Sequence, residues 1–531
     1  MLRFKTLSAI VVLVALLSIG GTIGWAEQEQ PQYGGTIVLQ ESQDFVGLNP
    51  LQETDYYSRG GMRQIFDSLL ELSPETRLPA ALLAEKWEFN KDGSEITFYL
   101  HHGVKFHNGQ ELTSEDVKFS IEWILAPNHA TKRKPDLDWI DHVQVIDEYT
   151  FKIVVKPESV PNAAALTTLA TLRISVVPKD FAGMTLEAFN EHPIGSGPFE
   201  FKEWVRGDHL TLVKNTDYWL KEPYLDQVIF RAIPKLATAM LELEKGGVDI
   251  TDNVLSDYIP QYKEREDIVI QQVPAEDFYW IGFNVIRAPF NNITFRKAVS
   301  MSIDMDGAQQ VIKGNASVRA YGIVSPTVWG NDREYLKNNV ALKKDDEKAK
   351  QLFQELKDAG VIPPDFSPIV YTPPDPVRIK LGEILVTNLQ QNGINAELRT
   401  LEWATYVGLL YGEERNYNIY VIGYPGFPEP SYLLEHLFAS KNAEPGFTNW
   451  CYYKNPAVDL LLDTAARTLD HNLRESYYVA AQRLILEDYV VIPAYHNLVT
   501  RGVRARVHDY HAFTDYALVS PYNNVWVEPR K

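Results

Sequence analysis

The chain has 531 residues, with 51 basic and 70 acidic side chains and a formal net charge of −19. This length exceeds what one hydrophobic core normally supports, so we expect two or more domains. The acidic balance argues against nucleic acid or anionic lipid as a partner. The single cysteine, Cys451, excludes a disulfide within the chain. Because Cys451 lies beside Trp450 and Tyr452, we expect it to pack in a core rather than to act as a nucleophile.

The first 26 residues have the pattern of a secretory signal peptide. Arg3 and Lys5 give a positive start, residues 7–19 are almost entirely apolar, and Gly24 and Ala26 are the small residues expected before a cleavage site. The apolar run is short for a membrane span, and an uncleaved anchor is the alternative. We therefore predict cleavage after residue 26 and a free periplasmic protein, because the only cysteine lies far from this segment and is no lipid-attachment site.

Short segments in the first third of the chain alternate between apolar and polar residues, a pattern typical of strands with one buried face. Residues 37–39 form an apolar run after two glycines and predict an opening strand. Residues 96–100 and 104–106 alternate and predict a hairpin. Residues 113–116 resemble a capping box that starts a helix, and residues 151–155 predict a further strand.

Later segments have helical spacing. Apolar residues between 349 and 359 form one stripe that stops at Gly360, a favourable helix end. A second stripe over 384–389 ends near Gly393, and a strand is expected to follow through residues 396–398. Helices that alternate with strands in this way indicate α/β domains.

Motifs of catalysis are absent from the sequence, which contains no G-x-S-x-G elbow, no H-E-x-x-H motif and no P-loop. Gly195 and Gly197 form a lone G-x-G, without the third glycine of a dinucleotide fingerprint. We therefore predict that the chain is not an enzyme and binds no cofactor. A hydrolase with two carboxylates stays an alternative, because such pairs are close in space rather than in sequence.

Three histidines, His101, His102 and His107, are candidates for metal ligands. On a predicted hairpin, His101 and His102 point to opposite faces, which argues against joint ligation. Zinc sites also show tighter patterns of ligand spacing. We therefore predict no metal site.

A set of short motifs extends in order over nearly all of the chain after residue 26. They are L-A-E-K-W-E (83–88), D-G (92–93), T-F-Y-L (97–100), G-V-K-F-H-N-G (103–109), L-T-S-E-D-V (112–117), G-S-G-P-F (195–199), N-x-D-Y-W (215–219), G-V-D-I (247–250), F-N with P-F (283–290), F-R-K-A with I-D (295–304) and N-P with D (455–459). As a joint pattern they closely resemble the family 5 extracellular solute-binding proteins, which are the dipeptide-, oligopeptide- and nickel-binding proteins of bacterial ABC transporters.

The resemblance implies an α/β fold of the periplasmic-binding-protein-like type II, with two lobes, three domains and a hinge of two chain crossings. The expected parts are a main domain of lobe 1 (27–61, 194–280 and 498–531), an extra domain attached to it (62–193) and lobe 2 (281–497). The crossings are expected near 278–284 and 494–500. Ligand would enter an open cleft, hinge closure would bury it, and the closed form would dock on ABC permease subunits. We expect a monomer; a periplasmic sensor with the same fold is the alternative.

The resemblance also bears on the ligand. In the peptide-binding members, an aspartate shortly before an acidic residue and a proline anchors the amino group of the peptide. Aligned on Glu429-Pro430, that position is Gly426 here, so the peptide pattern is broken. Aromatic residues in the neighbouring segments suit sugar rings as well as peptides. The predicted ligand-binding residues are Trp280, Trp403, Tyr406, Tyr424, Gly426, Phe427 and Trp450. A peptide stays slightly favoured, an oligosaccharide is close behind, and a nickel chelate is a third alternative.

Overall fold

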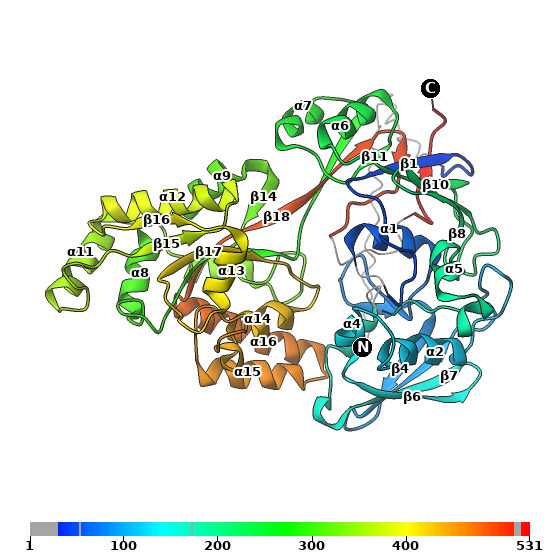
Figure 1. The fold of residues 1–531 in the computed structure, drawn as a ribbon, viewed down its shortest axis with the longest axis horizontal. Coiled ribbons are helices and arrows are strands. Elements are labelled where there is room, and N and C mark those ends of the chain that lie inside the picture. Colours follow the sequence, from blue (N-terminus) through cyan, green and yellow to red (C-terminus); the bar gives the residue numbers. More distant parts are fainter. Residues whose placement is uncertain (1–29, 53–54, 171–173, 515–521, 531) are drawn as a thin grey trace, which may run out of the picture.

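The computed structural model describes residues 30–52, 55–170, 174–514 and 522–530, so the predicted signal peptide lies outside the described residues. Figure 1 shows two lobes that are joined by the long strand β18 (Val491–Arg504). We name residues 30–274 with 498–530 lobe 1, and residues 278–497 lobe 2. Within the described residues, no helix combines the length and the apolar character needed to cross a membrane.

Lobe 1 contains a mixed sheet around its opening strand. β1 (Thr36–Glu41) runs parallel to β10 (Gln227–Ala232) and to β11 (Ile250–Thr251). The antiparallel strands β9 (His209–Lys214) and β8 (Phe199–Val205) continue this sheet on one side. The other strands of lobe 1 are β2 (Leu70–Leu72), β3 (Pro79–Ala81), β4 (Ala84–Phe89), β5 (Glu95–Leu100), β6 (Ile140–Asp147), β7 (Thr150–Val155), β12 (Ile268–Pro274), β19 (Val507–His508) and β20 (Trp526–Val527).

A separate four-stranded antiparallel sheet in lobe 1 has the strand order β4-β5-β7-β6. Helices cover this sheet and the mixed sheet (Figure 1). They are α1 (Tyr56–Ile65), α2 (Ser114–Leu125), α3 (Lys134–Leu137), α4 (Ala165–Ala170), α5 (Leu186–Glu191), α6 (Leu236–Lys245) and α7 (Ile259–Lys263).

Lobe 2 contains a sheet in the order β16-β15-β17-β13-β18. Its strands are β13 (Phe278–Phe283), β14 (Ser317–Arg319), β15 (Ile369–Thr372), β16 (Glu397–Thr400) and β17 (Ile419–Tyr424), and β14 pairs with β18. Its helices are α8 (Ile293–Met301), α9 (Met305–Ile312), α10 (Arg333–Asn339), α11 (Asp346–Asp358), α12 (Pro376–Gln391), α13 (Trp403–Tyr411), α14 (Pro430–Phe438), α15 (Pro456–Ala466) and α16 (His471–Glu487).

The chain passes between the lobes twice. The first crossing is residues 275–277, between β12 in lobe 1 and β13 in lobe 2. The second lies within β18, which pairs with β13 over Val491–Tyr495 and with β12 over Leu498–Arg504. The two crossings are side by side, because Ala275 N donates to Asn497 O at 2.8 Å. The predicted domain limits place the first crossing a few residues later in the chain than residues 275–277. These limits stay a proposal.

Each lobe has its own hydrophobic core. In lobe 1, one buried cluster surrounds β1 and extends to the small sheet, where Phe98 stacks on Phe151 at 5.3 Å between ring centres. In lobe 2, two clusters lie on opposite faces of β13, with Trp280 in one and Ile281 in the other. Burial of a large apolar side chain contributes about 1.5–3 kcal/mol. Because each of these clusters lies within one lobe, the lobes can move relative to each other without opening either core.

Most of the elements expected from the sequence are confirmed. Thr113 and Asp116 form a capping box at the start of α2, and the helix that was expected before Gly360 is α11. Gly360 has a φ of +68°, a left-handed conformation that glycine adopts without strain. β1, β7 and β16 also lie where strands were expected.

The predicted hairpin between residues 96–100 and 104–106 is wrong. β5 pairs with β4 on one side and with β7 on the other, so neither of its edges is available to residues 104–106. Val104 and Phe106 are nevertheless buried, as their alternation indicated. They belong to a loop in which Leu112 N donates to Val104 O.

Candidate functional site

A cavity of about 630 Å³ lies beside the hinge and is lined by both lobes. Lobe 1 contributes Tyr57 of α1 and residues 252–256, which follow the carboxyl end of β11. Lobe 2 contributes Lys313 and Ala316, and the two crossings contribute residues 275, 277 and 497–500. Ligands of α/β proteins bind outside the carboxyl ends of parallel strands, and cavities of about 300–1,000 Å³ are typical of binding sites.

The lobe 1 wall of this cavity is acidic but partly neutralised. Asp252 forms a short ion pair with Arg501, at 2.6 Å, and accepts a hydrogen bond from Ser42 Oγ at 3.1 Å. Glu41, at the end of the neighbouring strand β1, has its pKa raised well above its ordinary value by burial and by the charge of Asp252, against the opposing effect of Arg501.

Asp277 and Lys313 place opposite charges at the hinge. Asn497 donates to the Asp277 carboxylate through its backbone at 2.9 Å and through its side chain at 2.6 Å. Lys313 lies over the ring of Tyr495, 5.7 Å from its centre. Burial lowers the pKa of Lys313, and the charges of Asp277 and Asp375 oppose this effect.

A second cation of lobe 2, Arg378, lies outside the lining of the cavity and close to Tyr279. Asp375 caps α12 by accepting from Arg378 N at 2.9 Å, and this fixes the first turn of the helix. The guanidinium lies 5.5 Å from the ring centre of Tyr279 and 5.9 Å from that of Trp403. Its Nε is buried and has no hydrogen-bond partner among the described residues. A planar donor group held between two rings is suited to bind a carboxylate.

Tyr279 lies between the two kinds of charge. It stacks on Tyr495 with ring centres 4.5 Å apart. Burial raises the pKa of Tyr279, the charge of Asp277 raises it further, and Arg378 lowers it. The carboxylate of Asp277 and the guanidinium of Arg378 are thus both close to the ring of Tyr279, next to the hinge.

The predicted aromatic residues fall into two groups. Trp403 is 49% exposed, and Tyr424 is half-buried at the carboxyl end of β17. Trp280, Tyr406 and Trp450 are buried in the core of lobe 2, and Phe427 is 6% exposed. Contact of any of them with a ligand stays a prediction.

The buried group has specific packing. Trp280 stacks on Phe278 and on Trp450, with ring centres 4.9 and 6.1 Å apart. Tyr406 donates its hydroxyl to Val421 O at 2.8 Å. Cys451 is buried beside them, as expected, and burial raises the pKa of its thiol to about 12.

Gly426 is buried against the first crossing. A Cβ atom at this position would lie 1.7 Å from Glu276 O and 2.7 Å from Glu276 Cβ. Only glycine fits here without a backbone shift. The residue that lies against Gly426 is an acid, Glu276. Its carboxyl group is buried and accepts a hydrogen bond from Thr514.

Sequence reasoning missed three charged residues of this cavity, Asp252, Asp277 and Lys313, and also the nearby Arg378. One signal was available, because Asp375-Pro376 is a typical helix start after a short strand and places Arg378 in the first turn. The other three lie at chain crossings and loop ends, which have no periodic pattern.

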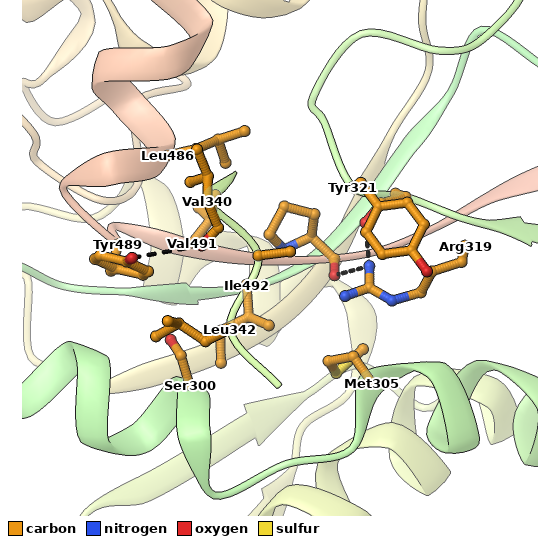
Figure 2. Close-up of a pocket in the computed structure, with 13 residues that line it drawn as sticks. Ser300, Met305, Arg319, Tyr321, Val340, Leu342, Leu486, Tyr489, Val491 and Ile492 are labelled. Atoms are coloured by element: carbon orange, nitrogen blue, oxygen red, sulfur yellow. Dashed lines mark hydrogen bonds between the residues drawn. The ribbon is translucent and has the colours of Figure 1, made fainter. Parts of the chain in front are cut away.

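A second cavity, shown in Figure 2, lies in lobe 2 among α8, α9, β14 and β18. Arg319 on its rim donates to Pro493 O at 2.7 Å. Its volume of about 40 Å³ accommodates a water molecule but no larger ligand.

A third cavity of about 560 Å³ is formed by lobe 1 alone, at the amino end of β11. There Asp249 forms ion pairs with Arg506 at 2.8 Å and with Arg530 at 3.2 Å, and these fasten the C-terminal segment to the sheet. Movement of the lobes would not enclose a ligand at this place. The hinge cavity is therefore the candidate site.

The histidines have structural contacts. His107 Nδ1 accepts from Gly195 N at 3.3 Å, and its Nε2 lies 3.0 Å from Gly197 O. Burial lowers the pKa of His107 to about 4, so the ring is neutral at physiological pH. Among the described residues, no group of three or more His, Cys, Asp or Glu side chains is arranged to hold a metal ion.

Comparison with known proteins gives consistent matches over most of the chain. Residues 79–445 match the model described as "Bacterial extracellular solute-binding proteins, family 5 Middle". The chain is 26% identical to the dipeptide-binding protein of Escherichia coli, over 84% of this chain and 86% of that protein. It is also 26% identical to heme-binding protein A of Haemophilus influenzae, over 90% and 89%. The solved structure of the periplasmic binding protein DppA from Helicobacter pylori with the peptide STSA has a TM-score of 0.70, 26% identity and coverage of 94% and 99%.

Proposed function

Because this chain belongs to the family 5 bacterial extracellular solute-binding proteins, we propose that it is the periplasmic component of an ABC importer and captures a short peptide. The ligand enters between the lobes, closure at the hinge buries it, and the closed form delivers it to the permease. The chain acts as a monomer and returns its ligand unchanged. The names of the relatives support a peptide rather than an oligosaccharide.

One observation carries the choice of ligand. Asp277 of the cavity and Arg378 beyond its lining are both close enough to act on Tyr279, so opposite charges are available to the two ends of a zwitterion. Arg378 receives the carboxylate of the peptide, because its helix turn is fixed by Asp375 and its Nε, 3.8 Å from the Asp375 carboxylate, has no hydrogen-bond partner among the described residues. Asp277 receives the amino group of the peptide. It thereby takes the role of the aspartate that peptide-binding members have at the position of Gly426.

The exposed Trp403 extends this site. Its ring lies beside the Arg378 guanidinium, with 5.9 Å between the guanidinium carbon and the ring centre. Tyr424 lies on the neighbouring strand end. Both rings are available to side chains of the peptide, since aromatic groups bind apolar and planar groups of varied shape.

Calorimetric titration tests the proposal. We expect binding of di- and tripeptides, and loss of most of this affinity when the C-terminal carboxylate is amidated. Arg378→Gln should weaken binding by about 10- to 100-fold, since a charge-assisted pair at a partly buried site contributes about 1.5–3 kcal/mol. Arg399→Gln is the matched control, because Arg399 is an exposed arginine on the neighbouring strand β16.

The same titration includes heme and β-linked disaccharides. Tight binding of either, without binding of peptides, would overturn the peptide assignment but leave the importer role intact. Mass spectrometry of the recovered ligand separates a binding protein from a hydrolase, because only a hydrolase releases products.

A further inference from the structure

The two lobes also touch at a place away from the hinge. The contact joins a short segment before and within α4 in lobe 1 to the ends of α14, α15 and α16 in lobe 2, as seen in Figure 1 below β18. We name residues 160–167 the strap.

Hydrogen bonds to backbone carbonyl groups form the first part of this contact. Ala163 N donates to Ala466 O at 3.2 Å, and Arg467 Nη1 donates to Val160 O at 3.3 Å. Within the strap, Ala164 N donates to Asn162 Oδ1 at 3.1 Å, which fixes the turn that presents these groups. The partners in lobe 2 follow each other at the end of α15.

A buried charge forms the second part. Glu429 Oε2 accepts from Thr167 Oγ1 at 3.1 Å, and Glu429 Oε1 accepts from Arg474 Nη2 at 2.6 Å. The Glu429 side chain is 2% exposed, and Thr167 is 3% exposed. A hydroxyl group of lobe 1 thus donates to the carboxylate of an ion pair that belongs to lobe 2. Hydrogen bonds to a charged acceptor are stronger than neutral ones.

The position of Glu429 links this contact to the cleft. Glu429 ends the segment that begins at Tyr424 and includes Gly426, which packs on the first crossing. The same short segment is therefore held at one end by the hinge and at the other end by the strap. Separation of the lobes must break the strap contacts, whereas the two covalent crossings only bend.

We propose that the strap is a releasable latch that limits how far the lobes separate in the ligand-free protein. It does not depend on the nature of the ligand, because none of its contacts involves the hinge cavity. Weakening the strap should increase the population of widely separated lobes. Loss of one such hydrogen bond should raise this population about fivefold, since a net contribution near 1 kcal/mol is typical.

Single-molecule FRET on the ligand-free protein tests the latch. Dyes are placed on Glu88→Cys in lobe 1 and Lys380→Cys in lobe 2, whose wild-type side chains are 64% and 54% exposed. The native Cys451 stays unlabelled, because it is buried and its thiol is not ionised. Thr167→Val removes the hydroxyl donor while keeping the shape of the side chain, and Arg467→Ala removes the bond to Val160 O.

We expect each variant to increase the low-FRET population, and the double variant to increase it more than either. Thr464→Val is the matched control, since Thr464 Oγ1 donates only to Leu460 O within α15. Distributions that coincide for wild type, both single variants and the double variant would overturn the proposal. Arg467 is on the surface, so its variant keeps the test valid if Thr167→Val proves unstable by circular dichroism.

Discussion

Each lobe buries a carboxyl group, but the two are neutralised differently. Asp67 in lobe 1 accepts hydrogen bonds from Ser196 Oγ at 3.3 Å, Tyr218 OH at 3.1 Å and Trp219 Nε1 at 3.0 Å, all of them neutral donors. Glu429 in lobe 2 has a cation, Arg474, at 2.6 Å.

The pKa values follow from this difference. Burial raises the pKa of Asp67 to about 7, and its three donors only partly oppose that effect. Burial also raises the pKa of Glu429, while the charge of Arg474 opposes this effect. A buried acid with neutral partners therefore titrates near neutral pH, whereas one with a cation depends on that cation.

The largest effect is expected from Arg474→Met, which leaves Glu429 buried without its cation. Breaking a buried pair by removing one partner costs about 3–5 kcal/mol. Urea denaturation at pH 7 should show this loss in the free energy of unfolding. Arg467→Met, on the neighbouring surface, should change stability by less than about 0.5 kcal/mol. Equal effects of the two changes would contradict the role given to Arg474.

The second effect is a pH dependence that Asp67 imposes on lobe 1. Its pKa is higher in the folded chain than in the unfolded chain, so the folded state binds the extra proton between pH 4 and 7. Its contribution to stability is present at the low end of this range and is lost as the pH rises towards 7. The free energy of unfolding of Asp67→Asn minus that of wild type should therefore increase by about 2–4 kcal/mol from pH 5 to pH 8.

The comparison with Asp67→Asn is necessary because two histidines act in the opposite direction. Burial lowers the pKa of His107 and of His496 to about 4, so their contribution is lost as the pH falls from 6.5 towards 4. Both histidines are present in wild type and variant, and their effect cancels in the difference. A difference that does not change between pH 5 and pH 8 would refute the raised pKa of Asp67.

The smallest effect is expected from Tyr218→Phe, which removes one neutral donor from Asp67. The cost should be about 1 kcal/mol at pH 5, where Asp67 is protonated, and about 2 kcal/mol at pH 8, where the lost hydrogen bond served a charge. Denaturation curves at the two pH values give both numbers. A cost that is equal at the two pH values would show that the tyrosine acts through packing alone.

The predictable part of the fold is the part with local causes. The capping box of α2 and the glycine after α11 involve residues only a few positions apart, and both are confirmed. The failed hairpin involves β5, whose true partner β7 is about 50 residues later in the sequence. Alternation shows which face of a strand is buried but not which strand lies beside it.

The same limit applies to the site. Trp280 and Trp403 were both predicted to contact the ligand, yet one is in the core of lobe 2 and the other is half exposed. Position 426 requires glycine because Glu276 lies against it. Glu276 is 150 residues earlier in the sequence and belongs to the first crossing of the hinge. Arg378 could be located by its helix start, but not its position between two rings.

The strand β18 has a consequence for how the chain folds. It pairs with β11 and β12 in lobe 1 and with β13 and β14 in lobe 2, and it begins only at residue 491. Until this strand is in place, both lobes have an open sheet edge that can pair with other chains. One late segment thus completes two domains at once, and a chain that stops short of it leaves two incomplete sheets rather than one finished lobe and one unfinished lobe.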